Sequence, residues 1–312
     1  MQQINDNRGR WGYDEVFHTW KEIEDDFKNT FLQEILHQLH ELRVKSDAQF
    51  QNLLALCIAK TKDWIIAKPL ELKMVTDVVD RQYIDLLKLN PKFREELEDA
   101  YGYDHKKLIK LASWLNVKTC PYCNMHYTLY AKEYITKRKI NKMAKFQFDH
   151  FYNKRDYPML SMSLYNLIPS CASCNQGKST GKIDLAFHPY NAAIANNFQF
   201  VVDNPIPLLQ GGDDRDLTIE LHPTGGNVDD IIAYDSMFHI KALYSRHRDV
   251  AREVFARAYE MPYYKYIQNF AFIGDRHFVE RLNLGFYPNE NEIELRPLTK
   301  FQQDLWKQAT NS

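Results

Sequence analysis

Residues 147–178, QFDHFYNKRDYPMLSMSLYNLIPSCASCNQGK, carry most of the pattern that decides the fold of this chain. Residues 145–149 alternate polar and apolar side chains, as a half-buried strand does, and His150 stands at the end of that strand. Residues 164–168 are predicted to form the returning strand, and a short helix is expected after Ser170. The order is therefore strand, loop, strand, helix, with the chemically active side chains at the ends of these elements.

Four of the five cysteines form two C-x-x-C pairs, Cys120 with Cys123 and Cys171 with Cys174. In a reducing compartment such pairs bind metals more often than they form disulfides, and zinc favours four thiolates in a tetrahedron. We therefore predict a structural zinc ion held by all four. A reactive redox pair or unrelated core thiols are the alternatives. The fifth, Cys57, lies in an apolar helical run and is predicted to be a core residue.

The composition fits a folded globular protein, with 45% hydrophobic and 13% aromatic residues among 312. The net charge of −1 does not mark the whole chain as a nucleic-acid binder. Residues 118–182, however, hold eleven Lys and Arg against three Asp and Glu. Such a surplus of positive charge is compatible with a phosphate-binding face, and equally with an ordinary solvated loop surface.

The sequence shows no targeting or membrane segment. Residues 1–6 are polar and lack the apolar core of a signal peptide. No stretch approaches the roughly 18 apolar residues of a membrane span. We expect a cytoplasmic protein without membrane association.

The chain divides by pattern into three parts. Residues 1–116 repeat apolar side chains at spacings of three and four and are predicted to form a helical lobe. Residues 117–190 hold the cysteine pairs and the strands between them, and residues 191–312 form a mixed α/β lobe. Further elements are predicted as strands at 127–130, 198–202 and 217–221, and as helices at 235–259 and 298–308.

Three short motifs follow one another in a characteristic order: Asp149-His150, then Asn166-Leu167, then residues 174–178 (CNQGK). This order resembles the HNH endonucleases, many of which carry two zinc knuckles around their core. The resemblance covers about a fifth of the chain. It implies an α+β fold with a ββα-metal nuclease core, flanked here by the helical lobe and the mixed α/β lobe. It also implies hydrolysis of phosphodiester bonds in DNA.

The resemblance assigns a role to each residue of these motifs. His150 would be the general base, since a pKa near 6.5 suits proton transfer at neutral pH. Asp149 and Asn175 would hold Mg²⁺ or Mn²⁺ through oxygen atoms, which these ions prefer. Asn166 would brace the loop and orient the imidazole.

Two cations could contact the substrate. Lys178, at the end of the predicted helix, is expected to bind a phosphate, and Arg155 is a second candidate. Taken singly, each motif residue also has an ordinary structural role available, such as a cap or a turn. Two further histidines, His126 and His188, lie near the cluster and are expected to be structural.

A narrower resemblance concerns residues 149–151 (DHF) and 157–171 (YPMLSMSLYNLIPSC). They look like the HNH component of Septu-type and retron-associated anti-phage defence systems, which work beside an ATPase. No Walker motif is present in this chain, so an ATPase would be a separate partner. An RNA-cleaving HNH nuclease, and a zinc-stabilised module that binds nucleic acid or protein without catalysis, are the alternative functions.

Overall fold

The computed structural model describes residues 19–102, 105–115, 117–136, 139–191, 197–205, 217–225, 227–259 and 276–310. Within these residues the chain forms two compact units. We call residues 19–115 and 128–191 the amino-terminal unit, and residues 117–127 and 197–310 the carboxyl-terminal unit. The protein is mainly helical with small two-stranded antiparallel sheets, which confirms the predicted α+β class. The predicted domain boundaries and the HNH core stay predictions.

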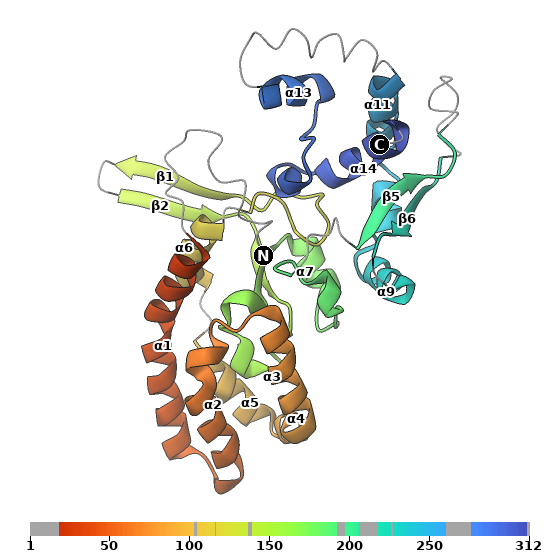
Figure 1. Cartoon of the computed structure of the whole chain (residues 1–312). Coiled ribbons are helices and arrows are strands. Elements are labelled where there is room, and N and C mark those ends of the chain that lie inside the picture. The colour runs from red at the N-terminus through yellow and green to blue at the C-terminus, as the bar shows by residue number, and fades with distance from the viewer. Residues whose placement is uncertain are drawn as a thin grey trace. The chain divides into compact units, whose positions relative to one another are not determined.

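Helices α1 to α6 occupy most of the amino-terminal unit (Figure 1). Their bounds are α1 Trp20–Lys45, α2 Gln51–Trp64, α3 Pro69–Gln82, α4 Ile84–Leu89, α5 Pro91–Ala100 and α6 His105–Leu115. They lie where the apolar spacing predicts helices, and residues 1–18 of the predicted lobe are outside the described residues. A membrane-crossing helix is not found in the described part of the chain.

Helix α1 shows why these segments are helical. Its buried side chains recur every four residues and form one face: Ile23, Phe27, Phe31, Ile35 and Leu39. Thr19 caps its first turn by accepting a hydrogen bond from the Glu22 amide, and the Glu22 carboxylate accepts from the Thr19 amide. The apolar face of α1 packs against α2 and α5. Cys57, on α2, is fully buried as expected for a core residue.

The antiparallel strands β1 (Tyr130–Thr136) and β2 (Lys139–Ala144) form a hairpin that the sequence did not predict. The predicted strand at 127–130 overlaps only the first residue of β1. Residues 131–145 are rich in lysine, and this charge concealed the strand pattern. The hairpin packs against α6.

The next elements are β3 (Gln147–His150), β4 (Leu167–Ser170) and α7 (Ala172–Lys178). Strands β3 and β4 pair antiparallel, and α7 packs against β3. The strand, loop, strand, helix order is confirmed, but the returning strand begins later than predicted. Leu164–Asn166 form a short 3₁₀ turn, and β4 starts only at Leu167.

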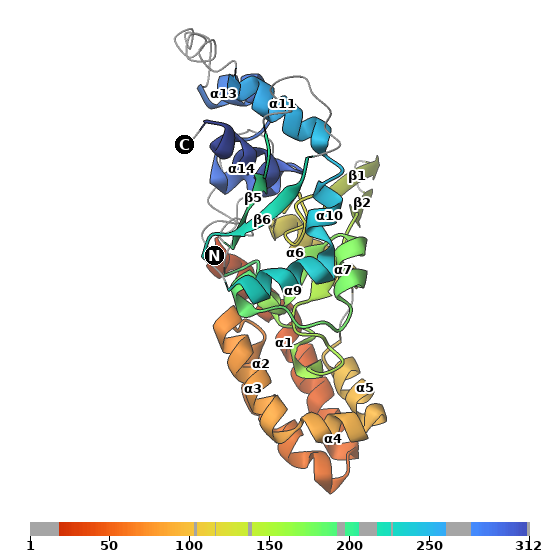
Figure 2. The ribbon, with the colours of Figure 1, turned by 90° about the vertical axis from the view of Figure 1, so that its right-hand side faces the viewer.

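The carboxyl-terminal unit contains one described hairpin and several helices. Their bounds are β5 Phe198–Val202, β6 Ile219–Pro223, α9 Val228–Phe238, α10 Ile240–Tyr244, α11 Arg248–Tyr259, α13 Arg276–Leu284 and α14 Thr299–Thr310. Helix α14 packs against β5 and α11, and Figure 2 shows α14 beside β5. The predicted strand at 217–221 begins two residues late, and the predicted final helix is α14.

The single long helix predicted over 235–259 is wrong, because the chain breaks twice within it. His239 adopts a left-handed conformation with φ of 53°, which ends α9. The Asp235 carboxylate then accepts a hydrogen bond of 2.7 Å from the Lys241 amide at the start of α10. A further turn separates α10 from α11, which begins at Arg248.

Candidate functional site

The four paired cysteines come together as a buried cluster. The Sγ atoms of Cys120, Cys123, Cys171 and Cys174 all lie within 4.8 Å of one another. Zn–S bonds of about 2.3 Å in a regular tetrahedron separate the sulfurs by about 3.8 Å, so the cluster has nearly the dimensions that such an ion requires. No disulfide is formed among them. This cluster could hold a metal such as zinc.

The first pair sits on a tight turn in the carboxyl-terminal unit. The Cys120 amide donates to the His126 carbonyl, and the Asn124 amide donates to the Cys120 carbonyl, both over 2.8 Å. Two tyrosines fix the turn from outside. The Tyr234 hydroxyl donates to the Tyr122 carbonyl over 2.5 Å, and the Tyr244 hydroxyl donates to the Cys123 carbonyl over 2.7 Å.

Asn124, the residue after this pair, is a structural centre that the sequence analysis missed. Its backbone is left-handed, with φ of 49°, and its side chain is buried. The amide nitrogen Nδ2 donates to Thr119 Oγ1 and to the Ile293 carbonyl, while Oδ1 accepts from the Lys300 amide. The signal that could have found Asn124 is the motif C-x-x-C-N, which both cysteine pairs share.

The second pair sits at the start of α7 in the amino-terminal unit. Cys171 is the N-cap of this helix, and its Sγ accepts a hydrogen bond of 3.4 Å from the Cys174 amide. The Asn175 amide donates to the Cys171 carbonyl as the first helical hydrogen bond. These contacts place the second pair at the first turn of α7.

Asp149 and His150 end β3, where they pair with Ile168 and Leu167 of β4. Both side chains are buried. The His150 Nε2 lies 3.0 Å from the Ser161 carbonyl oxygen. Because a carbonyl only accepts, the proton of a neutral imidazole stands on Nε2, and Nδ1 is the nitrogen that can take a proton.

The charge state of His150 follows from its burial. Loss of solvent lowers the pKa of His150 to about 3, and the positive charges of Lys154 and Lys178 lower it further. The hydrogen bond to Ser161 opposes this shift but does not cancel it. The imidazole is therefore neutral at pH 7, but a pKa of about 3 lies well below the value near 6.5 on which the predicted role of general base was based, and it makes the ring a weaker base in this structure.

Asn166 braces the loop that follows His150. Its Nδ2 donates to the Tyr152 and Leu160 carbonyls over 3.0 and 2.9 Å, and its Oδ1 accepts from the Tyr152 amide over 2.8 Å. The side chain is fully buried, so these bonds are shielded from water. The loop from His150 to Leu160 is thus tied to the start of β4.

The two residues predicted on α7 have different surroundings. Asn175 is half-buried, and its Nδ2 donates to Gln147 Oε1 on β3 over 2.6 Å. Lys178 is buried, with its Nζ 3.1 Å from an Asp149 carboxylate oxygen and 2.6 Å from the His150 carbonyl. Arg155 is exposed. The roles assigned to these residues stay predictions.

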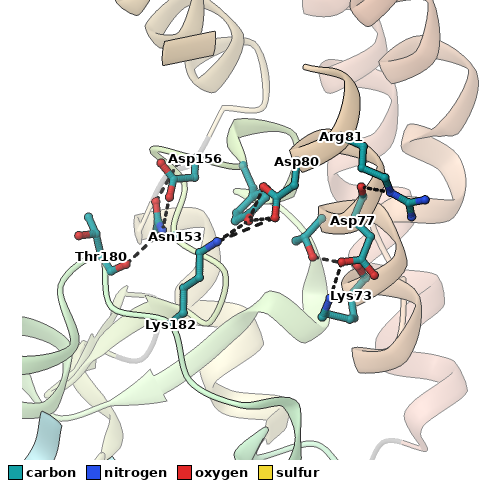
Figure 3. A network of polar contacts seen from close by, with 10 residues as sticks. Lys73, Asp77, Asp80, Arg81, Asn153, Asp156, Thr180 and Lys182 are labelled. Atoms are coloured by element: carbon teal, nitrogen blue, oxygen red, sulfur yellow. Dashed lines mark hydrogen bonds and ion pairs between the residues drawn. The ribbon is translucent and has the colours of Figure 1, made fainter. Parts of the chain in front are cut away.

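The loop after His150 is also tied to helix α3. The Tyr157 hydroxyl donates to both carboxylate oxygens of Asp80 over 2.9 and 3.0 Å, and Lys182 donates to Tyr157 over 3.2 Å. Figure 3 shows Lys182 facing Asp80, and Asn153 bonded to Asp156 and Thr180.

The two spare histidines differ in their environment. His188 is fully buried, its ring centroid lies 4.1 Å from that of Phe151, and burial lowers its pKa to about 3. This packing fits the structural role expected for it. His126 is exposed on the turn of the first cysteine pair.

Comparison with known proteins adds no relative to this chain. It gives no match to a protein-family model, to a curated protein or to a solved structure.

Proposed function

We propose that this chain is a metal-dependent HNH-type endonuclease that hydrolyses phosphodiester bonds of DNA. The observation that carries the proposal is His150. Its imidazole is buried, its Nε2 lies 3.0 Å from the Ser161 carbonyl oxygen, and it directly follows a buried aspartate. An imidazole held in this way has one nitrogen able to accept a proton from an attacking water.

The arrangement of the elements supports the proposal. Strands β3 and β4 and helix α7 follow in the order of a ββα core, and α7 packs against β3. Asn166 fixes the loop between the strands through three hydrogen bonds, and a fixed loop would limit the orientations open to the His150 ring. Four buried cysteines whose sulfurs lie within 4.8 Å of one another support a structural zinc ion that would stabilise the fold.

Asp149 and Asn175 are the residues that would hold a divalent ion. Both offer oxygen ligands, which suit Mg²⁺ or Mn²⁺, and they stand on the packed elements β3 and α7. The hydrogen bond from Asn175 Nδ2 to Gln147 fixes the side-chain amide and leaves its other atom, Oδ1, as the ligand. A bound ion would supply charge stabilisation at the scissile phosphate and the leaving oxygen.

Side chains of the protein would accept the proton and align the base. Nδ1 of His150 would accept the proton of the attacking water, and Asn166 would keep the ring aligned. Arg155 is exposed and could contact a backbone phosphate.

The test is incubation of the purified protein with plasmid DNA, single-stranded DNA and RNA, with and without Mg²⁺. We expect Mg²⁺-dependent cutting of DNA, reduced at least about 100-fold by His150→Ala because the general base is lost. Zinc content and folding should not change. His126→Ala, an exposed histidine near the first cysteine pair, is the matched control and should keep full activity.

Other outcomes separate the alternatives. Cutting of RNA alone would make the chain a ribonuclease on the same core. Binding of DNA without cutting, in Mg²⁺ or Mn²⁺, would favour a non-catalytic zinc module and contradict the proposal. The ATPase partner and the role in anti-phage defence rest on the sequence resemblance, and adding a candidate ATPase to the same assay tests them.

A further inference from the structure

Lys178 is the last residue of α7, and its side chain has no exposed surface. Its Nζ lies 3.1 and 3.3 Å from the two carboxylate oxygens of Asp149 and 2.6 Å from the His150 carbonyl oxygen. The ammonium therefore joins two consecutive residues at the end of β3 to the end of α7.

A buried ammonium is stable only where its hydrogen bonds and charge are satisfied. Burial lowers the pKa of Lys178, and the Asp149 carboxylate opposes that shift. Turning the side chain outward to a phosphate would leave Asp149 buried without this cation and remove the bond to His150. The sequence-based assignment of Lys178 as a phosphate contact would thus require breaking all of these interactions.

We propose that Lys178 is a positioning residue, which holds the Asp149 carboxylate and the His150 backbone in their working geometry. The inference rests on the proposed nuclease function. Because Cys174 and Lys178 are one helical turn apart, they lie on the same face of α7. The cysteine anchors the helix, and the lysine transmits the position of that helix to β3.

The experiment compares Lys178→Met and Lys178→Arg with the wild-type protein. It measures kcat and KM for DNA cleavage, and DNA affinity in Ca²⁺ over a series of KCl concentrations. For both variants we expect kcat to fall about 100-fold, as displacement of a catalytic group does, with KM and the salt dependence unchanged. Arginine should fail as well, because its larger planar head does not reproduce a closed ammonium site.

The opposite pattern would overturn the proposal. A phosphate contact predicts unchanged kcat, weaker binding and a salt slope reduced by about 0.9 in Lys178→Met, with Lys178→Arg close to the wild type. A purely structural role predicts a lower melting temperature with unchanged kcat for the folded protein, which would also refute it. If Lys178→Met does not fold, Lys178→Arg keeps the charge and gives the same decision.

Lys182→Met is the matched control, because Lys182 lies in the same segment with a side chain 67% exposed. It should keep the wild-type kcat. The two proposals can fail separately. A wild-type protein that cuts no nucleic acid refutes the nuclease function, whereas an active wild type with an unchanged kcat in both Lys178 variants refutes only the positioning role.

Discussion

The two cysteine pairs share the pattern C-x-x-C-N, yet the protein supports them in different ways. After the first pair, Asn124 is buried with φ of 49° and binds residues as distant in sequence as Ile293 and Lys300. After the second pair, Asn175 is a half-buried helical residue whose side chain bonds to Gln147. The comparison teaches that the same local sequence can place one asparagine as a buried tertiary anchor and the other as a half-buried residue of a helix.

The two turns that carry the cysteine sulfurs also differ in the hydrogen bonds that hold them. The turn around Cys120 and Cys123 is held by hydroxyls of Tyr234 and Tyr244, more than 100 residues away in the sequence. The turn around Cys171 and Cys174 is completed by the N-terminal cap of α7. The tyrosine hydrogen bonds to the first turn thus come from distant parts of the sequence, whereas the capping bond of the second lies at the start of α7.

Loss of metal ligands should have the largest effect and should not distinguish the pairs. Cys123→Ser and Cys174→Ser each break the same four-sulfur set, and structural zinc contributes about 10 kcal/mol or more to folding. We expect both variants to lose bound zinc and to lose the cooperative melting transition. Metal analysis and circular dichroism measure this.

Cys57→Ala is the control, since Cys57 is buried outside the cluster. It should keep one zinc per chain. Retention of zinc by either serine variant would contradict the shared site.

Replacing each of the two asparagines by alanine tests whether they differ in their contribution to stability and to cleavage. Asn124→Ala should lower the free energy of unfolding by about 3 kcal/mol, because it removes buried hydrogen bonds and places alanine at a positive φ. Asn175→Ala should cost less than about 1 kcal/mol but abolish cleavage if it holds the ion. Urea unfolding and the plasmid assay give both values.

A result in which both asparagine variants lose stability equally would break the comparison. So would an Asn175→Ala protein that keeps wild-type activity.

Acid should affect the two units in opposite directions. The pKa values of His150 and His188 are both lowered to about 3, chiefly by burial, so each of them costs the amino-terminal unit about 1.4 kcal/mol per pH unit as pH falls below about 6.5. The pKa of Glu294 is raised to about 8, first by burial and also by Glu292, so the carboxyl-terminal unit loses stability as pH rises from about 4.5 through 8. Hydrogen exchange resolved by segment measures both.

His188→Gln should remove only the share of the pH dependence that His188 contributes to its unit, leaving that of His150. Glu294→Gln should reduce the pH dependence of the carboxyl-terminal unit, where Asp304 also has a raised pKa. A uniform change of protection in both units would refute this prediction.

The smallest effect concerns the tyrosines beneath the first pair. Tyr234→Phe and Tyr244→Phe each leave a buried carbonyl without one donor, which should cost about 1 kcal/mol. Tyr259→Phe, at an exposed position, should change stability by less than about 0.5 kcal/mol. Thermal melting ranks the three variants, and equal melting temperatures would show that these hydroxyls do not stabilise the turn.

Much of the local structure could be read from residue patterns. The apolar spacing of α1, the alternation before His150 and the capping position of Cys171 each depend on neighbours within one or two turns. The sequence pattern did not predict the helix break at His239, because the apolar periodicity continues across it. The helix ends there because His239 adopts a left-handed backbone conformation. The β1–β2 hairpin was not predicted because charged residues masked the alternation of polar and apolar side chains in its strands.

The sequence by itself determined the two cysteine pairs, the strand–loop–strand–helix order and the position of His150 at a strand end, because spacing and periodicity are local properties. Only the tertiary structure decided that Asn124 is a buried anchor and that Lys178 faces Asp149 instead of solvent. Asn124 meets partners 169 and 176 residues away, and Lys178 meets one 29 residues away. Contacts at such separations depend on how whole elements pack, which no short pattern encodes.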